Sequence, residues 1–344
     1  MKENKSHLIS VIIPLKKLTY YLLFENIPEF EKQTYKNFEV IILPNEHAQY
    51  DLTLLKKYKW LKIIPTGKVI KPAEKRNLGV KTARGDIIAF IDDDAYPRPD
   101  WLEQAVKKFD KSISAVCGPG LLPKNAGNWE KIFDQVITSN LGSGQYTYRF
   151  IPQKQRYVDD YPSMNFFVKK NIFQKIGGFK GNYWPGEDSK LCEDIVYKEN
   201  GTILYHPKVV VYHHRRNNLA GFLKQHSNYG FHRGAFFAHG DKNSKRISYF
   251  IPTLFVFYLI ILLIFFIFTF FFNTRYNILN TIYFPAIIYL IFSAQLFFNA
   301  LFDSRNIIVA FLSPLVLFLT HLTYGILFVK GLLKGLRNKE NIYI

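Results

Sequence analysis

The chain has 344 residues, a length that allows one large domain and an appendage, and its two cysteines are too few for a disulfide framework. Its formal net charge of +18 could indicate nucleic-acid binding, but seven basic residues cluster over 215–246, just before the first long apolar segment. Positive residues at such a place contact anionic lipid head groups and hold their side of the membrane in the cytosol. We therefore expect membrane lipids, and no nucleic acid, as the partner of this charge.

Patterns typical of strands and helices alternate four times in about the first 90 residues, which predicts βαβ units. The expected strands are 8–14, 38–43, 61–64 and 87–91, and the expected helices are 20–32, 54–57 and 72–83. The strand at 87–91 is apolar throughout, as in a strand buried on both faces of a largely parallel sheet. The predicted fold class is therefore α/β, with a Rossmann-like, doubly wound mixed sheet.

The middle of the chain has a looser pattern. Helices are expected at 101–109, 169–176 and 187–200, and strands at 115–122, 163–168, 202–205 and 209–212, whereas residues 125–160 show no pattern that assigns them. In the segment 219–237, aromatic and basic residues are interleaved. That mixture is typical of a helix lying in the membrane interface.

Residues 249–329 contain only three charged side chains, and their apolar segments 249–272, 278–300 and 306–329 are each long enough to cross a bilayer. We therefore divide the chain into an α/β domain (1–216), an interfacial amphipathic and basic segment (217–248), a membrane region of about three transmembrane helices (249–330) and a basic tail (331–344). The first residues do not have the pattern of a signal peptide, so we expect the α/β domain in the cytosol.

Two rules conflict over the side of the membrane on which the tail lies. A cytosolic first domain followed by three spans places the tail outside, but residues 330–344 carry four basic residues against one acid, which favours the cytosol. One solution is that the middle segment, 278–300, forms a re-entrant or interfacial hairpin. The other, which we favour, is that three spans override the charge of the tail.

Three consecutive carboxylates, Asp92, Asp93 and Asp94, follow the apolar strand at 87–91. Ligands of open parallel sheets bind at the carboxyl ends of the strands. Adjacent acids raise one another's pKa unless a cation or several hydrogen-bond donors compensate them, and a divalent metal is the simplest occupant. Oxygen ligands favour Mg²⁺ or Mn²⁺. A solvated turn or a helix N-cap would also account for such a triplet.

Two further pairs of residues could contribute to chemistry at this edge. Glu187 and Asp188 lie in the first turn of an expected helix, where the dipole favours an ionised carboxylate that can accept a proton; alternatively they only cap that helix. His213 and His214 follow the last expected strand. Neighbouring residues on a strand point to opposite faces, so at most one histidine faces a metal, and we choose His213.

Several motifs occur in a characteristic order along the chain. They are SVIIP from Ser10, AEKRNLGVKTARGDIIAFIDDD ending at Asp94, PRPDWLEQAV, MNFFVKKNIFQKIGGF from Met164, GEDSKLCEDI from Gly186, YHPKVVVYHHRR from Tyr205 and KQHSNYGFHRG. In this order they resemble the family 2 glycosyltransferases of GT-A fold, in particular membrane-anchored members similar to bacterial exopolysaccharide glycosyltransferases. The resemblance covers almost the whole chain.

The resemblance implies roles for the acidic residues and one histidine. Asp92 and Asp94 match the ends of the family's DxD motif, whose acids contact the nucleotide sugar and hold the metal bound to its diphosphate. Asp188 matches the residue that deprotonates the acceptor hydroxyl, and Glu187 is its neighbour in that motif. His213 or His214 resembles a histidine that completes the metal shell in some members.

Other positions are implied to contact the donor. Arg76 matches a basic residue on the donor side. Its neighbour Lys75 is expected to be a charge on the surface of a helix. Asp93 lies inside the DxD motif, and the loops that begin at Pro14 and contain Asn45 match loops that line the base and ribose pocket. Both loops depart from the usual family sequence.

The resemblance implies an inverting, metal-dependent transfer of a sugar from a nucleotide-sugar donor, with a UDP-sugar first, to a lipid-linked or glycan acceptor. The protein would be a multi-pass cell-membrane protein with a cytosolic catalytic domain. One alternative is a processive polysaccharide synthase, against which the absence of a Gln-x-x-Arg-Trp sequence in the interfacial segment counts. The other is a catalytically silent membrane scaffold that keeps the fold.

Overall fold

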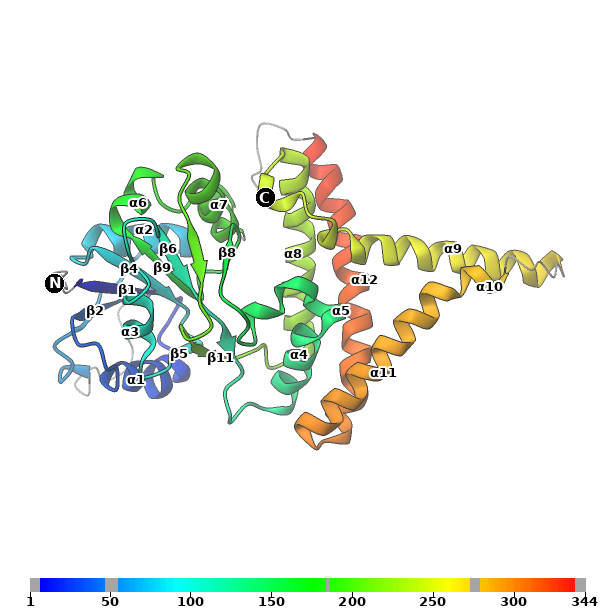
Figure 1. Cartoon of the computed structure of the whole chain (residues 1–344), viewed down its shortest axis with the longest axis horizontal. Coiled ribbons are helices and arrows are strands. Elements are labelled where there is room, and N and C mark those ends of the chain that lie inside the picture. The colour runs from blue at the N-terminus through cyan, green and yellow to red at the C-terminus, as the bar shows by residue number, and fades with distance from the viewer. Residues whose placement is uncertain (1–6, 47–54, 184–185, 273–278, 338–344) are drawn as a thin grey trace. The chain divides into compact units, whose positions relative to one another are not determined.

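The computed structural model describes residues 7–46, 55–183, 186–272 and 279–337. They form two compact units: residues 7–123 and 148–214 make the first, and 124–147 and 215–337 the second (Figure 1). Residues 124–147, which the sequence placed in the α/β domain, thus pack with the C-terminal helices. The expected helix at 54–57 lies partly outside the described residues, as does the basic tail beyond Arg337.

The first unit is built on a mixed sheet of eight strands in the order β3-β2-β1-β4-β9-β6-β10-β8. These strands are β1 (Ile9–Pro14), β2 (Phe38–Leu43), β3 (Leu61–Ile63), β4 (Ile87–Ile91), β6 (Ala115–Cys117), β8 (Arg156–Val158), β9 (Asn165–Lys169) and β10 (Ile203–Tyr205). The strands β3, β2, β1 and β4 run parallel to one another, whereas β9 runs antiparallel to both β4 and β6. The sequence prediction of an α/β fold with a doubly wound mixed sheet is confirmed.

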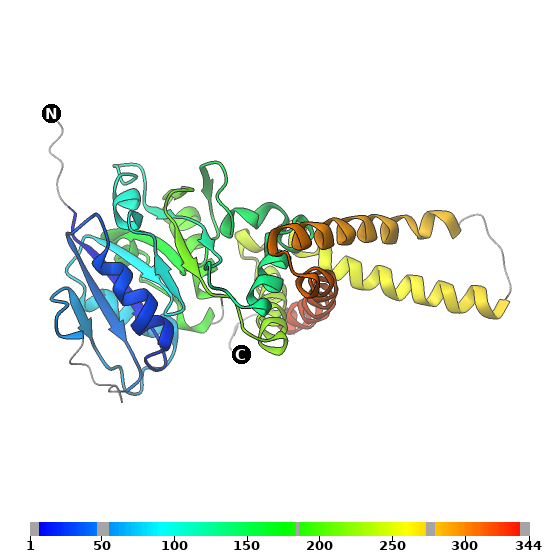
Figure 2. The same cartoon turned by 90° about the horizontal axis from the view of Figure 1, so that it is seen from below.

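Helices cover both faces of this sheet because β1, β2 and β4 are apolar at every position except Ser10 and Glu39 (Figure 2). On one face, α1 (Ile27–Glu31), the π-helical turn η1 (Leu22–Asn26) and α3 (Trp101–Val106) pack on alternate residues such as Val11 and Ile13. On the other face lie α2 (Pro72–Thr82) and α6 (Lys170–Lys175). A Cβ on Gly79 of α2 would lie only 2.6 Å from Ile12, so glycine allows this close packing.

A second, three-stranded sheet in the order β5-β11-β7 stands beside the first. It contains β5 (Ala95–Pro97), β7 (Gly120–Leu121) and β11 (Val211–His213). The expected strand at 115–122 is divided between the two sheets, because the chain turns at Gly118. A Cβ there would lie 1.9 Å from the carbonyl oxygen of Val209.

The helix expected at 187–200 is present as α7 (Glu187–Glu193) followed by the π-helical η5 (Asp194–Lys198), and η4 (Gly181–Tyr183) precedes it. The segment that the sequence left unassigned contains three helical elements and β8. They are α4 (Asn128–Thr138), α5 (Asn140–Ser143) and η3 (Gly144–Arg149). Of these, α4 and α5 belong to the second unit.

The second unit is helical. Besides α4 and α5 it contains α8 (Leu219–His239), η6 (Lys242–Ser244), η7 (Ile247–Tyr249), α9 (Ile251–Phe272), α10 (Leu279–Ile282), α11 (Phe284–Ser304) and α12 (Ile307–Arg337). Three of them, α9, α11 and α12, are long and apolar enough to span a membrane. The expected aromatic and basic helix is present as α8, and it packs along α12 with its Phe222, Ala235 and Phe236 buried.

Candidate active site

The aspartate triplet lies where β4 ends and the chain turns into β5. Because β11 pairs antiparallel with β5, with His213 opposite Ala95, the end of β11 comes beside this turn. The ring nitrogen Nε2 of His213 lies 3.1 Å from Oδ1 of Asp94, and the backbone N–H of His214 donates to the carbonyl oxygen of Asp94 at 3.0 Å. Residues about 120 positions apart are thus joined by strand pairing.

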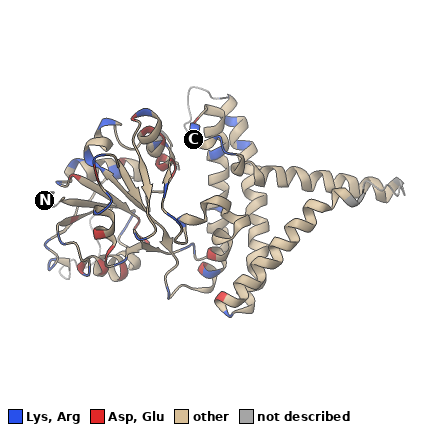
Figure 3. Ribbon diagram, viewed as in Figure 1, with Lys and Arg blue, Asp and Glu red and all other residues tan. Residues whose placement is uncertain are grey.

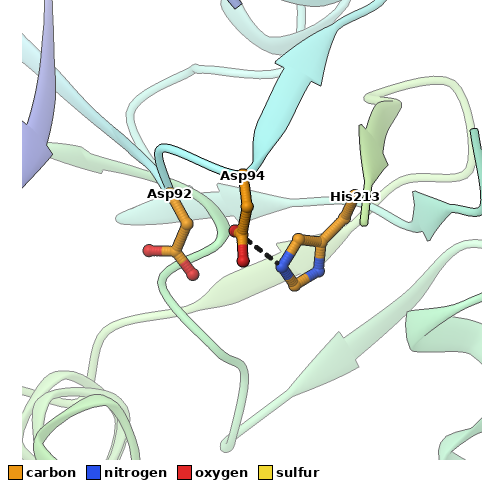
Figure 4. A group of neighbouring side chains, drawn as sticks. All are labelled: Asp92, Asp94 and His213. Carbon is orange, nitrogen blue, oxygen red and sulfur yellow. Dashed lines mark hydrogen bonds and ion pairs between the residues drawn. The ribbon is translucent and has the colours of Figure 1, made fainter. Parts of the chain in front are cut away.

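Asp92, Asp94 and His213 form a group that could hold a metal ion (Figure 4). One ligand atom from each lies within 4.8 Å of the others, and each side chain is partly exposed. Two carboxylates and an imidazole are a donor set that Mn²⁺ and Mg²⁺ accept. The residues therefore fit the metal that the sequence predicted.

The neighbouring histidine, His214, has a different environment. Its Nε2 lies 2.7 Å from Oε2 of Glu25, and its ring stacks on Tyr21 with the centroids 4.1 Å apart. Because it is buried against the η1 segment, His214 fixes that segment to the end of β11. The choice of His213 as the histidine beside the carboxylates agrees with this geometry.

Arg76 connects the aspartate triplet to the start of α7. Its guanidinium is buried and donates to Oδ1 of Asp92 at 3.1 Å and to Oε1 of Glu187 at 3.0 Å. Burial alone would lower the pKa of Arg76, but the charges of Asp188, Asp92 and Glu187 raise it above its ordinary value. Arg76 is therefore a permanent positive charge among these acids.

The two acids at the start of α7 differ in their hydrogen bonds. Besides its contact with Arg76, Glu187 accepts the backbone N–H of Gly186 at 3.1 Å, so it acts at the helix start as a capping residue would. In Asp188, Oδ2 accepts the backbone N–H of Ser163 at 3.1 Å, while Oδ1 is buried and has no hydrogen-bond partner among the described residues. Asp188 is thus the acid with a buried oxygen that no described residue hydrogen-bonds.

Burial, together with the charge of Glu187, raises the pKa of Asp188 to about 7, against the opposing effect of Arg76. The sequence prediction considered only the helix dipole, which favours the ionised form, whereas removal from water raises the pKa of Asp188. The result suits a proton acceptor better. A base is most effective when its pKa lies near the working pH.

Asp93, the middle acid of the triplet, is partly buried. Burial raises its pKa to about 7, and the charges of Asp94 and Asp92 act in the same direction. The hydroxyl of Thr19 donates to Oδ2 of Asp93 at 3.2 Å. The mutual repulsion expected from the sequence is therefore present, and a nearby cation would relieve it.

Lys75 is not the surface charge that the sequence suggested, because it is 1% exposed. Its ammonium donates to the carbonyl oxygens of Leu15 and Leu43, the latter at 3.0 Å, and to Oδ1 of Asn45. Burial lowers its pKa to about 8. Lys75 thereby joins the loop that follows Pro14 to the loop that contains Asn45, which are the two loops assigned to the donor base and ribose.

Some buried polar residues that hold the site were missed by sequence reasoning. Asn165 on β9 donates to the carbonyl oxygens of Gly118 and Val209 at 2.6 and 2.8 Å and accepts the indole N–H of Trp101. The hydroxyl of Ser189, one residue after Asp188, donates to Oδ1 of Asp160 at 2.7 Å. The only sequence signal for Asn165 is a polar residue at the start of an apolar strand.

A surface groove of about 820 Å³ lies at the opposite end of β4, lined by residues such as Gly85, Asp86 and Lys169. It contains none of the acids or histidines of the candidate site. The chemistry is therefore assigned to the carboxyl end of β4, where the charged side chains meet.

The family model described as "Glycosyl transferase family 2" matches residues 10–177. Residues 10–177 are a family 2 glycosyltransferase domain. The chain also resembles, over its whole length, a solved mannosyltransferase from Pyrobaculum calidifontis, PcManGT, in complex with GDP-Man and Mn²⁺. That likeness has a TM-score of 0.50 at 16% identity and covers 98% of this chain and 89% of the other, which shows a common GT-A fold.

Two named proteins are also similar in sequence to this chain, which contains the family 2 glycosyltransferase domain. A Mycobacterium tuberculosis protein named pre-mycofactocin glycosyltransferase is 27% identical over 159 residues, 46% of this chain but only 33% of its own length. A Methanococcus voltae protein is 26% identical over 342 residues, 95% of this chain and 98% of its own. Its name is dolichyl N-acetyl-alpha-D-glucosaminyl phosphate 3-beta-D-2,3-diacetamido-2,3-dideoxy-beta-D-glucuronosyltransferase. These comparisons support a glycosyltransferase, as the motifs predicted.

Proposed function

We propose that this protein is an inverting, metal-dependent glycosyltransferase that moves a sugar from a nucleotide-sugar donor to a membrane-associated, lipid-linked saccharide. The observation that carries the proposal is the arrangement around Arg76. This buried cation bonds Asp92 of the metal-binding group and Glu187 beside Asp188. Two functions that the reaction needs, compensation of a diphosphate and acceptance of a proton, therefore occur in one connected cluster.

Asp188 is the proposed general base. The acceptor hydroxyl oxygen would form a bond to the anomeric carbon while the bond from that carbon to the diphosphate breaks, and the hydroxyl proton would move to Oδ1 of Asp188. A single displacement of this kind inverts the configuration at the anomeric carbon. Glu187 holds Arg76 in place rather than taking the proton, since both of its oxygens already accept hydrogen bonds.

Asp92, Asp94 and His213 are the proposed metal ligands. A divalent ion held there supplies Lewis-acid stabilisation of the leaving diphosphate. Arg76 and Asp93 complete the donor side, and Lys75 sets the distance between the two loops at Pro14 and Asn45. A UDP-sugar remains the first donor to test, with a GDP-sugar second because the PcManGT structure contains GDP-Man.

The membrane helices support a lipid-linked acceptor. An acceptor that cannot leave the bilayer requires an enzyme that stays at the bilayer, and α9, α11 and α12 are apolar enough for this purpose. The name of the M. voltae relative, which this chain matches from end to end, specifies a dolichyl-linked substrate. We place the catalytic unit in the cytosol and the protein in the cell membrane as a multi-pass protein.

The test uses the purified full-length protein, a panel of nucleotide sugars and lipids extracted from membranes. We expect metal-dependent release of one nucleoside diphosphate and transfer of label into the lipid fraction, both lost in Asp188→Asn. The anomeric configuration of the product reports inversion, and its length separates single transfer from a processive synthase. Release of no nucleotide from any donor, together with no metal-dependent nucleotide binding, would indicate a silent scaffold instead.

A further inference from the structure

The second unit contains an arrangement that a simple count of apolar helices does not predict. Along its whole length α12 packs on segments that precede the first apolar helix in the chain. Those segments are α4 and α5, which are inserted between β7 and β8 of the first unit, and α8, which follows His214 directly. The chain reaches all three segments before its first apolar helix, and therefore before it can cross the membrane.

The amino end of α12 is fixed to α4. Nε2 of Gln135 on α4 donates to Oδ2 of Asp303 at 3.1 Å, at the end of α11 and four residues before α12 begins. The side chain of Asn306, which caps α12, lies 3.4 Å from that of Asn128. Further along, Nε2 of His321 lies 3.0 Å from the carbonyl oxygen of Leu141 on α5.

The carboxyl half of α12 is fixed to α8 through glycines. A Cβ on Gly230 or Gly234 of α8 would lie 2.4 or 2.1 Å from a carbonyl oxygen of α12, and a Cβ on Gly331 of α12 would lie 1.8 Å from that of Phe231. The two helices run parallel, since residue numbers rise together along both. Backbones this close form a tight pair of helices, as small residues allow.

The first turn of α9 also meets α12 near its middle. Thr253 donates to the carbonyl oxygen of Gly325 at 3.2 Å, and the rings of Phe250 and Phe328 lie 4.9 Å apart. If α9 and α11 both cross the membrane, the amino end of α9 and the carboxyl end of α11 lie on the same side of it. Helix α12 begins beside the end of α11 and contacts the start of α9 near its own middle. Residues 326–337 that remain would reach only about 18 Å, too short for a hydrocarbon core of about 30 Å.

We propose that α12 does not cross the membrane but lies along its surface, on the side of the catalytic unit, beneath a hairpin made by α9 and α11. The hairpin contains only one charged residue among the described positions of its two long helices, Asp303, and its two arms are almost entirely tan in Figure 3. The basic tail then lies in the cytosol. The conflict between three spans and a positive tail disappears, because the number of crossings is even.

The exposed face of α12 fits a bilayer surface. Seven of its exposed side chains are large and apolar and lie within about 100° of the helix circumference at 100° per residue. They are Ile307, Ile308, Phe311, Leu315, Ile326, Leu333 and Leu336, each more than half exposed. The buried residues of α12, such as Ser313 and Thr320, lie on the opposite face, towards α4 and α8.

Depth measurements by spin labelling test this arrangement. Single cysteines replace Phe311, Leu315, Ile326 and Leu333 in the full chain, which is reconstituted in vesicles of phosphatidylcholine and phosphatidylglycerol. Collisions with oxygen and with a water-soluble nickel chelate then give the depth of each label. We expect one shallow depth at all four positions, whereas a crossing helix would carry them through about 33 Å.

Matched labels on α9 should be deepest at Ile261 and shallower at Leu254 and Phe268 in the same vesicles. The native cysteines are fully buried, and the chain without an added cysteine measures their background. A cysteine appended after Ile344 should react with a membrane-impermeant reagent only after cells are opened. A depth profile in α12 that is deepest at its middle, or labelling of the appended cysteine in intact cells, would overturn the proposal.

Discussion

Replacing Asp188 by asparagine removes the proposed proton acceptor and keeps the shape of the side chain. The hydrogen bond from Ser163 can persist, because the amide oxygen of asparagine accepts it. General-base catalysis contributes about 10²–10⁴-fold to turnover, so we expect a loss of that size in kcat. The KM for the donor should change little, since a base acts on the chemical step.

The pH dependence of turnover in the wild-type protein gives a second, independent test of Asp188 as the base. With a pKa of about 7, Asp188 would be ionised in about a tenth of the molecules at pH 6 and about nine tenths at pH 8. Turnover should therefore rise about tenfold over this range and then level off. The rising limb should be absent from the residual activity of Asp188→Asn.

The matched control is Glu187→Gln. The charge of Glu187 raises the pKa of Asp188, so its removal should move the midpoint of the pH profile below 7 while most of the turnover at pH 8 is kept. The assay is release of nucleoside diphosphate with saturating acceptor. If Glu187→Gln were nearly inactive and Asp188→Asn nearly normal, the roles of the two acids would have to be exchanged.

Four other changes have defined outcomes. Asp94→Asn should abolish transfer without lowering the melting temperature. His213→Ala should weaken metal affinity, and excess Mn²⁺ should restore its activity. Wild-type activity of Asp94→Asn without metal would exclude the proposed ligands. Lys75→Met leaves the carbonyl oxygens at the strand ends without a hydrogen-bond donor, which costs about 1–3 kcal/mol of stability. The melting temperature should therefore fall, and the KM for the nucleotide sugar should rise. An unchanged KM would show that Lys75 does not act on the loops that bind the nucleotide sugar. Gly331→Val forces α12 away from Phe231 and should lower the melting temperature in detergent. The control Leu333→Val changes an exposed side chain and should not lower it. Equal stability of the two variants would contradict the tight pairing of α8 and α12.

The strands that form the centre of the sheet could be predicted almost to the residue. The sequence expectation for β2 and β4 agrees with the observed bounds, because an apolar run buried on both faces and ended by Pro44 or Asp92 is a local signal. Alternation along a strand predicted that at most one of the two histidines lies beside the carboxylates, and the structure places His213 there. These features depend on residues close together in the chain.

The burial of Lys75 could not be predicted in the same way. In a helix beside Glu74 and Arg76 it has the pattern of a surface lysine, but its acceptors are the carbonyl oxygens of Leu15 and Leu43, 60 and 32 residues away. Helix α4 was missed for a similar reason. Its partner in packing is α12, whose first residue lies about 180 positions further along the chain.

Binding of Mn²⁺ measured by electron paramagnetic resonance tests the central claim most directly. The full-length protein is titrated with Mn²⁺ in the presence of UDP or GDP, and free Mn²⁺ is read from its solution spectrum. We predict one tight site per chain that requires the nucleoside diphosphate in the wild type and in Asp188→Asn, and that is lost in Asp94→Asn. Equal binding by wild type and Asp94→Asn would contradict the account.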